Sequence, residues 1–489
     1  MSDPSSRPEG QVLTRRIMGV ETEYGIACTA GSRRLLMPDD AARYFFRPIV
    51  EQYSCSNIFT PNSSRLYLDV GSHPEVATPE CDSVRQLLAY DRAGDRIVNS
   101  LAQQAEEAIA WERLAEKAGI TADAAQVYLF RNNVDAIGNS YGCHENYLVH
   151  RSIILKELGL KLLPFLVTRQ LLCGAGKIYR PFAGSPSEKY GPGFCFSQRA
   201  DHVWEGVSSA TTRSRPMINT RDEPHADSTR FRRLHVIVGD SNVAEPTTRL
   251  KISSTLLMLE MIEAGFPLPS FPLEDEVTAI RDVSHSLNGL APLALKDGGT
   301  VTALDIQRSY FDAATAWAGQ REGGIGEHAE ALDLWGRVIQ ALDTGDLSLI
   351  DTEVDWAIKY SLFSRFVDGQ GLAWDDPKLA QIDLRYHDIR PERSIAHALM
   401  RKGLIKTVLT EAEVEAAWKK APPTTRARLR GAFLEAAAAH NAEITVDWTS
   451  IKLNRPEPRR VELLDPFATV DPAVDELLEQ IRGSGAEGS

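Results

Sequence analysis

Long apolar runs, paired cysteines and a signal peptide are all missing from this sequence of 489 residues. No apolar run approaches the roughly 20 residues that a membrane-spanning helix needs. The six cysteines are scattered and none belongs to a Cys-x-x-Cys pair, so neither a zinc site nor a disulfide framework is indicated. Residues 1–14 are rich in Ser, Pro, Glu and Gly, and we expect a flexible tail. These absences predict a cytoplasmic protein with reduced thiols and no membrane partner.

Basic residues are also in deficit. The chain has 54 Lys and Arg against 67 Asp and Glu, which gives a net charge of -13. Such a charge repels phosphate backbones and argues against nucleic acid as the main ligand. A P-loop is missing too, because Gly174-Ala175-Gly176-Lys177 lacks the spacing of that motif and the Ser or Thr that should follow its Lys.

The most informative stretch that is present covers residues 65–75, which we expect to form one strand ending near Pro74. In a strand, successive side chains point to opposite faces. Arg65, Tyr67 and Asp69 would therefore share one face, while Leu66, Leu68 and Val70 would share the other. An isolated example of this pattern would be an ordinary half-buried strand with a solvated polar face.

The same alternation recurs in three other expected strands, at residues 16–28, 143–149 and 233–240. The polar face of these strands would carry Glu21, Glu23, His144, Asn146, Arg233 and His235. A sheet face lined with carboxylates, imidazoles and guanidinium groups is too costly to desolvate and leave empty. We expect it to hold something charged, and a nucleotide with a divalent metal fits this mixture of groups.

Helices are predicted from the spacing of apolar residues. They cover residues 41–53, with Asp39 or Asp40 as cap, and then 83–116, 153–172, 247–264, 303–317, 327–343 and 353–368. A change of character near residue 408 predicts a second unit with a helix at 425–440, a strand at 444–452 and a helix at 472–482. The predicted division is a tail at 1–14, a catalytic domain at 15–408, a small C-terminal domain at 409–482 and a tail at 483–489.

Arginine is concentrated between residues 197 and 240. This segment contains Arg199, Arg213, Arg215, Arg221, Arg230, Arg232 and Arg233. The segment is either a solvated loop or a clamp for phosphate and for a carboxylate substrate, which arginine binds with two parallel hydrogen bonds. The sequence leaves both readings open.

Four motifs carry a family resemblance. Residues 16–25 (RIMGVETEYG), 65–75 (RLYLDVGSHPE), 138–147 (GNSYGCHENY) and 218–227 (INTRDEPHAD) resemble the Pup ligase family, and the similarity runs from about Arg15 to Phe467. That family attaches the prokaryotic ubiquitin-like protein Pup to target lysines. The resemblance implies an α+β fold like that of glutamine synthetase, in which a curved, mostly antiparallel sheet forms the active-site cradle and helices pack behind it, with a small C-terminal domain.

Site residues follow from the resemblance together with the strand pattern. The resemblance implies Mg²⁺ ligands at Glu21, Tyr67 and Glu75, ATP contacts at Arg65, Thr78 and Trp448, and a proton acceptor at Asp69. The strand pattern adds Glu23, His144 and His235 to the metal group, and the arginine-rich segment adds Arg221 and Arg233 to the ATP group. A neutral phenol is a poor metal ligand, so Tyr67 would contribute through its backbone or a water.

The implied reaction joins the γ-carboxylate of the C-terminal glutamate of Pup, through a glutamyl phosphate, to the ε-amine of a target lysine. The expected cofactors are ATP and Mg²⁺, and the expected partners are acidic, disordered Pup and lysine-bearing proteins. Basic groups among residues 199–233 or 426–430 are candidates for binding Pup, although the second group also suits a solvated helix face. We expect a monomer.

Three other functions compete with this reading. The Pup deamidase and depupylase shares residues 219–227, but it typically has a long insertion before the Arg65 strand and reads Asp-His-Ala-His-Pro-Glu at the motif. A small-molecule glutamate–amine ligase, such as glutamate–cysteine ligase, fits the strand pattern alone. A non-enzymatic scaffold fits least, because every expected carboxylate is present.

Overall fold

The computed structural model describes residues 12–69, 71–120, 125–135, 138–181, 184–210, 215–455 and 457–484. Within these ranges the largest sheet has the strand order β11 (Glu205–Ser208), β12 (Pro216–Asn219), β13 (Phe231–Val236), β8 (Cys143–His150), β1 (Met18–Glu23), β6 (His73–Ala77), β5 (Arg65–Asp69) and β4 (Asn57–Phe59). All neighbouring pairs are antiparallel except β11 and β12. The predicted α+β class with a mostly antiparallel sheet is confirmed.

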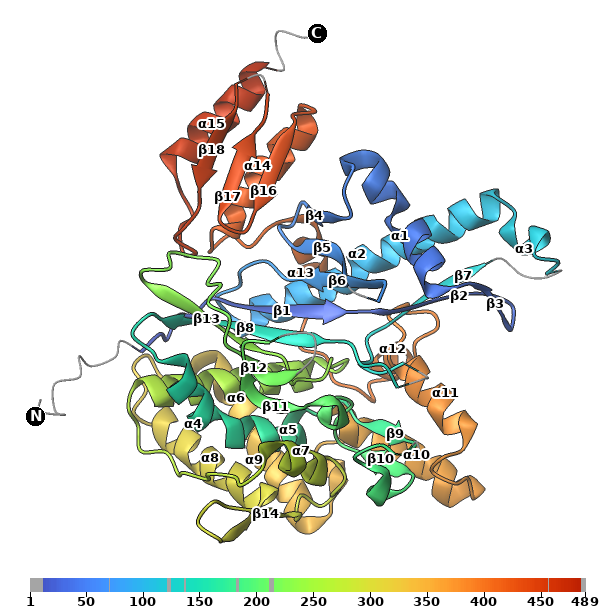
Figure 1. Cartoon of the computed structure of the whole chain (residues 1–489), viewed down its shortest axis with the longest axis vertical. Helices are drawn as coiled ribbons and strands as arrows, with labels where there is room; N and C mark the ends of the chain where they lie inside the picture. The colour runs from blue at the N-terminus through green and yellow to red at the C-terminus, as the bar shows by residue number, and fades with distance from the viewer. Residues whose placement is uncertain are drawn as a thin grey trace, which may run out of the picture.

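Smaller sheets surround this main sheet. They are β3 (Arg33–Leu36), β2 (Gly25–Ala30) and β7 (Gln126–Phe130); β16 (Ile444–Asp447), β17 (Ser450–Leu453) and β18 (Arg459–Glu462); β10 (Gly193–Cys195) and β9 (Lys177–Tyr179); and β14 (Pro292–Ala294) and β15 (Thr300–Thr302). Figure 1 shows the main sheet crossing the middle of the molecule, with most helices below it and the last three strands above it.

The helices form two groups along the chain. The first group is α1 (Pro38–Tyr53), α2 (Val84–Trp111), α3 (Leu114–Lys117), α4 (Leu155–Thr168), α5 (Gln170–Cys173), α6 (Glu245–Glu263) and α7 (Glu276–Ser284). The second is α8 (Ala303–Ala318), α9 (Ala329–Thr344), α10 (Asp355–Gln370), α11 (Pro377–Tyr386), α12 (Ile395–Arg401), α13 (Glu411–Lys419), α14 (Ala427–Ala439) and α15 (Pro472–Ser484). No helix of the described part of the chain is long and apolar enough to cross a membrane.

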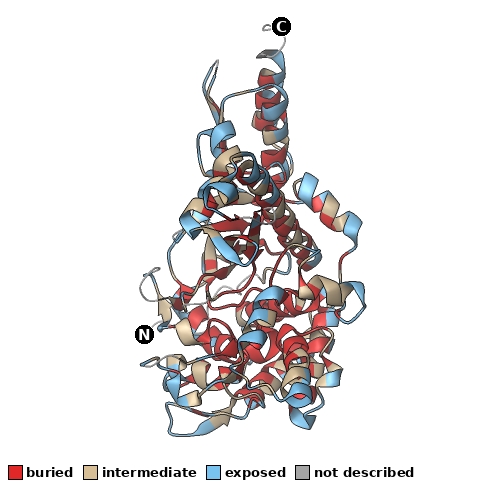
Figure 2. Ribbon diagram, turned by 90° about the vertical axis from the view of Figure 1, so that its right-hand side faces the viewer, coloured by how far each residue is buried: buried red, intermediate tan, exposed pale blue. Residues whose placement is uncertain are grey.

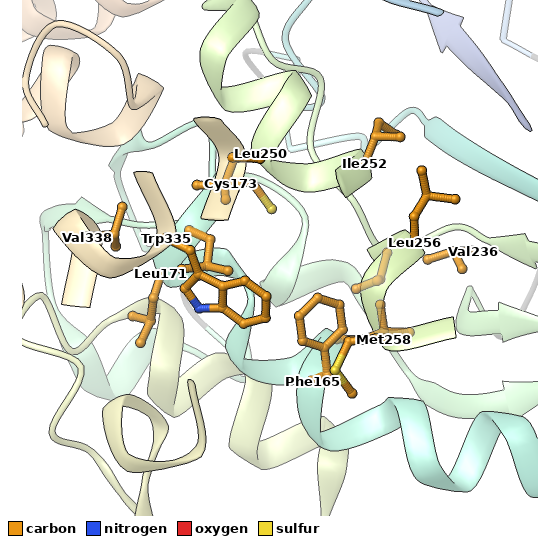
Figure 3. Close-up of a cluster of buried hydrophobic side chains, with 14 of the residues drawn as sticks. Phe165, Leu171, Cys173, Val236, Leu250, Ile252, Leu256, Met258, Trp335 and Val338 are labelled. Carbon is orange, nitrogen blue, oxygen red and sulfur yellow. The ribbon is translucent and has the colours of Figure 1, made fainter. Parts of the chain in front are cut away.

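The largest hydrophobic core lies between the main sheet and the helices α4 to α10. Helix α6 is buried on almost every side, as expected of a central helix. Phe165 and Trp335 lie close together in this core, with ring centroids 6.0 Å apart, and Figure 3 shows them facing the side chains of α6. Figure 2 shows buried residues concentrated in the sheet and this helical layer, which gives the strands a rigid support.

A separate apolar cluster holds the C-terminal module, by which we mean residues 425–484. It joins α14 and α15 to β17 and β18 through Leu429, Phe433, Ile451, Leu477 and neighbouring side chains. Val414 and Ala417 of α13, by contrast, pack into the main core. The predicted domain boundaries stay a prediction, and most of both predicted tails lies outside the described residues.

The expected strand at residues 65–75 was wrong in one respect, because the structure forms a hairpin of β5 and β6. Gly71, with φ of +87°, and Ser72, with φ of +65°, turn the chain between the two strands. Pro74 therefore lies inside β6, opposite Leu68. Leu66 is fully buried as expected, but Leu68 is exposed, and Val70 lies outside the described residues.

Three further expectations were wrong in detail. Residues 16–28 divide into β1 and β2, which belong to different sheets, and Gly25 at the start of β2 lies against the Tyr141 hydroxyl, where a Cβ would not fit. Residues 153–172 divide into α4 and α5. Helix α1 has Met37 rather than an aspartate at its N-cap, because Pro38 occupies the first position, and Asp39 instead accepts a hydrogen bond from Ser72 (2.6 Å).

Candidate active site

Four neighbouring strands of the main sheet, β8, β1, β6 and β5, bring the predicted acidic residues and their neighbours together. In the register of the sheet, Glu21 on β1 lies opposite His144 on β8, and Glu23 lies opposite Glu75 on β6. Tyr67 on β5 lies opposite Glu75. Directly opposed residues of antiparallel strands point to the same face. Glu21, Glu23, Tyr67, Glu75 and His144 therefore line one face of the sheet, as the alternation predicted.

Glu21 is the most heavily bonded carboxylate on this face. Its Oε2 lies 3.1 Å from His144 Nδ1, and its Oε1 accepts a hydrogen bond from Asn146 Nδ2 at 2.9 Å. Arg233 and His235 on β13 approach it to 3.8 and 3.9 Å. Burial acts to raise the pKa of Glu21, but the His144 hydrogen bond and the neighbouring imidazole and guanidinium groups outweigh it and lower the pKa below its ordinary value. Glu21 is therefore an anion at neutral pH.

Glu75 has the opposite electrostatic environment. Burial and then the charges of Glu21 and Glu23 raise its pKa well above the ordinary value. Burial, together with the charges of Glu21 and Glu75, also raises the pKa of Tyr67, which keeps the phenol protonated and able to donate a hydrogen bond to Glu75. Without a compensating cation, these carboxylates repel one another.

The chemistry of this donor set fits a divalent cation. Ligand atoms of Glu21, His144 and His235 all lie within 4.8 Å of one another, and so do those of Glu23, Glu75 and His144. His235 Nε2 is buried without a hydrogen-bond partner. Burial lowers the pKa of His235 to about 3, so its imidazole is neutral and can act as a ligand. The carboxylates are the oxygen ligands that Mg²⁺ prefers.

Asp69 and Arg65 flank this group on β5. Asp69 shares the face of Tyr67 at the end of the strand and adds to the negative field around Glu75. The Arg65 guanidinium lies over the rings of Tyr67 (5.4 Å) and Phe59 (5.9 Å) and donates to Asn57 Oδ1 at 2.8 Å. The predicted base and the predicted arginine are thus beside the metal group rather than in separate places.

A pocket of about 600 Å³, counted with its opening to solvent, adjoins the acidic face. Glu21, Thr78, Arg233 and Trp448 line it, and so do apolar residues that include Ile17, Met18, Leu148, Ala226 and Pro466. Thr78 is fixed in place by Val20, whose N–H donates to its Oγ1 at 3.0 Å. The lining of the pocket therefore combines charged and apolar side chains.

Arg221 is not part of this arrangement. Its side chain is 54% exposed, lies 3.8 Å from Glu223 and does not line the pocket. The other arginines between residues 197 and 240 have different surroundings. Arg199 is buried and bonded to the carbonyl of Tyr141, Arg232 pairs with Asp222 at 3.4 Å, and Arg213 lies outside the described residues.

The interpretation of residues 426–430 as a solvated helix face was wrong for the two end residues. Arg426 and Arg430 are 2% and 0% exposed and both pair with the buried Glu80. They are therefore not available as a basic surface for an acidic chain.

The sequence pattern did not single out several residues that shape the site. Asn146 was predicted to share a strand face with His144, but its hydrogen bond to Glu21 was not predicted. Gly142 leaves room for the metal group, since an added Cβ would lie 2.5 Å from Glu23 Oε1 and even closer to the His144 ring. His225 and Arg426 also line the pocket, but they come from a loop and from the start of α14, and no local pattern marks them.

An acidic face whose donor set fits a divalent cation, beside a pocket, is typical of enzymes that use a nucleotide with a divalent cation. The comparisons with known proteins narrow this class. The Pup-ligase protein family model matches residues 16–452, and the chain belongs to that family.

Two close relatives are Pup--protein ligases. The chain is 56% identical over 473 residues to the Pup--protein ligase of Corynebacterium glutamicum strain R, covering 96% of each chain. It is 57% identical over 475 residues to that of Corynebacterium efficiens, covering 96% of this chain and 95% of the relative.

Two solved structures are similar throughout. The ligase PafA in its complex with Pup matches with a TM-score of 0.90 and 54% identity, covering 96% of this chain and 93% of that one. PafA in complex with ADP matches with a TM-score of 0.83 and 55% identity, covering 99% of both.

Proposed function

We propose that this chain is an ATP-dependent ligase that joins Pup to lysines of target proteins, and that the face of β13, β8, β1, β6 and β5 is its active site. One observation carries the proposal. Glu21, Glu23, Glu75 and His144 meet on one sheet face, and Glu21 also lines the adjoining pocket, in a chain more than half identical to Pup--protein ligases. One solved relative holds Pup and another holds ADP, which supports both substrates.

Mg²⁺ would be held by Glu21, Glu23 and Glu75, with His144 and His235 beside them. When bound, the cation neutralises charge on the phosphates of ATP. Tyr67 orients Glu75 through the hydrogen bond from its protonated hydroxyl. His144 and Asn146 fix the two oxygens of Glu21, so the carboxylate is positioned before a ligand arrives.

The first chemical step forms an acyl phosphate. The γ-carboxylate of the C-terminal glutamate of Pup attacks the γ-phosphorus of ATP, a new O–P bond forms, and ADP leaves. Arg233 points into the pocket beside Glu21 and is held by Asn146 Oδ1 at 3.2 Å. Its guanidinium, which is always charged, would contact non-bridging phosphate oxygens.

The second step requires a base. A lysine ammonium has a pKa near ~10.4 and is not a nucleophile until it loses a proton. Asp69 accepts that proton, the lysine nitrogen attacks the acyl carbon, the N–C bond forms and phosphate leaves. No thiol nucleophile is needed, and burial raises the pKa of Cys173 and Cys195 to about 12, which keeps both unreactive.

The test uses Pup ending in glutamate or in glutamine, each with ATP, Mg²⁺ and a lysine-bearing acceptor. We expect the glutamate form to give a conjugate whose mass is the sum of both proteins less one water, together with ADP. Deamidation of the glutamine form without any conjugate would instead establish a deamidase. Turnover of free glutamate with a small amine would establish a small-molecule ligase.

A cytoplasmic location is part of the proposal. All six cysteines are free thiols, and five of them are buried. Unpaired thiols are typical of proteins that work in a reducing compartment.

A further inference from the structure

The C-terminal module reaches the nucleotide pocket through one buried carboxylate. Glu80 is 6% exposed and follows Thr78 at the edge of the pocket. Its Oε1 accepts hydrogen bonds from Arg426 Nε (2.7 Å) and Arg430 Nη2 (2.6 Å), and its Oε2 accepts one from Arg430 Nη1 (2.9 Å). The Glu80 carboxylate, which lies outside the C-terminal module, thus holds two arginines at the start of α14.

The same two arginines hold the backbone around the pocket. Arg430 Nη2 donates to the carbonyl of Trp448 at 3.0 Å, in the turn between β16 and β17. Arg426 donates to the carbonyls of His225 and of Leu463, the latter at 2.8 Å. Trp448, His225 and Arg426 all line the pocket. Every one of these contacts depends on the arginines remaining where Glu80 fixes them.

The Trp448 ring is fixed from the same direction. It packs edge-on against Phe59 of β4, with ring centroids 4.9 Å apart. The Arg430 guanidinium lies over both rings, 4.8 Å from the centroid of Phe59 and 5.2 Å from that of Trp448. Aromatic and cation–π contacts of this kind are directional, so they set the orientation of the indole as well as its position.

The charge balance explains why the arrangement is rigid. Burial acts to raise the pKa of Glu80, but Arg430 and Arg426 outweigh it and lower the pKa to about 2. Separating a buried carboxylate from the two guanidinium groups that it bonds would leave buried charges uncompensated. The arrangement therefore behaves as one fixed unit at neutral pH.

We infer that Glu80 is a positioning residue for nucleotide binding, acting through Arg430 and Arg426 to hold Trp448 of the C-terminal module against the pocket. The inference rests on the proposed function, because it takes the pocket as the site of ATP. It assigns no chemical step to Glu80. Loss of Glu80 should weaken nucleotide binding and leave the rate at saturating ATP largely unchanged.

The test is a double-mutant cycle of Glu80→Gln and Trp448→Ala, with ADP binding measured by calorimetry and the KM for ATP and kcat by conjugation to Pup. We expect Glu80→Gln to raise the Kd for ADP and the KM for ATP about tenfold in the native background. In the Trp448→Ala background the same substitution should change them less than about twofold. Equal effects in both backgrounds, or no effect, would overturn the inference.

Two further variants separate positioning from stability. Arg430→Lys keeps a cation beside Glu80 but cannot bond Glu80 and the Trp448 carbonyl together, so it should raise the Kd even if Glu80→Gln fails to fold. Glu353→Gln is the matched control, because Glu353 is also a buried carboxylate between two cations, Arg337 (2.6 Å) and Lys406 (3.0 Å), outside this pocket. It should lower the melting temperature without changing the Kd.

ADP binding by the wild type separates a failure of the proposed function from a failure of the inference about Glu80. A wild-type chain that bound no ADP would overturn the proposed function and this inference together. Tight binding by the wild type that Arg430→Lys leaves unchanged would overturn the inference alone.

Discussion

Residues of the same type in this site differ in pKa because their surroundings differ. Glu21, which is partly buried, and Glu75, which is buried, lie on the same sheet face, yet the pKa of Glu21 is lowered and that of Glu75 is raised. Glu21 has imidazole, amide and guanidinium neighbours, while Glu75 has two other carboxylates. This asymmetry gives the face a permanent anion and a set of oxygens that need a cation.

Asp69→Asn tests the second chemical step at the level of one side chain. The amide is the same size as the carboxylate but cannot accept a proton, so we expect transfer to lysine to fall by at least about 100-fold. Binding of ATP and of Pup, measured by calorimetry, should stay close to wild type. A variant that conjugates at a near wild-type rate would refute the assignment of Asp69 as the base.

Residue identities on the strand faces were the part of the site that the sequence could reveal. The period-two alternation placed Glu21, Glu23, His144 and His235 on one face before any coordinates, and the register of the strands bears this out. The roles of these residues stay predictions. Arg221 shows the limit of composition as a guide, because an arginine in the same polar segment lies at the surface with Glu223.

At the level of elements, the entry into β8 controls how closely the metal group can pack. Gly142 precedes Cys143 and sits against His144 and Glu23. The local backbone conformation likewise forms the turn of the neighbouring hairpin, between β5 and β6. The alternation across residues 65–75 hid the β5–β6 turn, because Gly71 and Ser72 reverse the chain without interrupting the pattern of polar residues.

Gly142→Ala should displace the metal group without unfolding the sheet. The new methyl would have to push His144 or Glu23 aside, and we expect the affinity for Mn²⁺, used as a spectroscopic probe in place of Mg²⁺, to fall at least about tenfold. Gly193→Ala is the control, because a Cβ there meets nothing within 4 Å. Equal Mn²⁺ affinities for the two variants would show that the strand entry does not shape the site.

At the level of the whole molecule, contacts between distant segments complete the pocket. Glu80 and Arg430 are 350 positions apart, and Trp448 comes from a turn that the sequence suggested was a continuous strand. Residues this far apart show no common period, so neither the pairing nor the junction of the C-terminal module with the sheet could be predicted. Most helices could be predicted, because each depends on local apolar spacing, whereas the α+β class followed from the family resemblance.

Buried histidines make the whole fold sensitive to acid. Burial lowers the pKa of His328, which is 4% exposed, to about 4. The unfolded chain takes up that proton near pH 6.5, so between about 6.5 and 4 the unfolded state binds more protons and the free energy of unfolding falls as the pH falls. His328 alone should account for about 2 kcal/mol between pH 7 and pH 5.

Denaturant titrations at these two pH values measure the effect. His328→Gln has no imidazole to protonate, and its free energy of unfolding should fall correspondingly less than that of the wild type. If both proteins lose the same stability on acidification, His328 is protonated as easily in the folded state as in the unfolded chain.

The formation of an acyl phosphate in a metal-dependent pocket is the central claim, and trapping it with hydroxylamine is the most direct measurement. Hydroxylamine is already unprotonated at neutral pH, so it captures an acyl phosphate without help from a base. With Pup, ATP and Mg²⁺ but no target, mass spectrometry should find the hydroxamate of Pup at equal levels for the wild type and Asp69→Asn, and none for Glu21→Gln. Hydroxamate formed by Glu21→Gln at the wild-type rate would contradict the account.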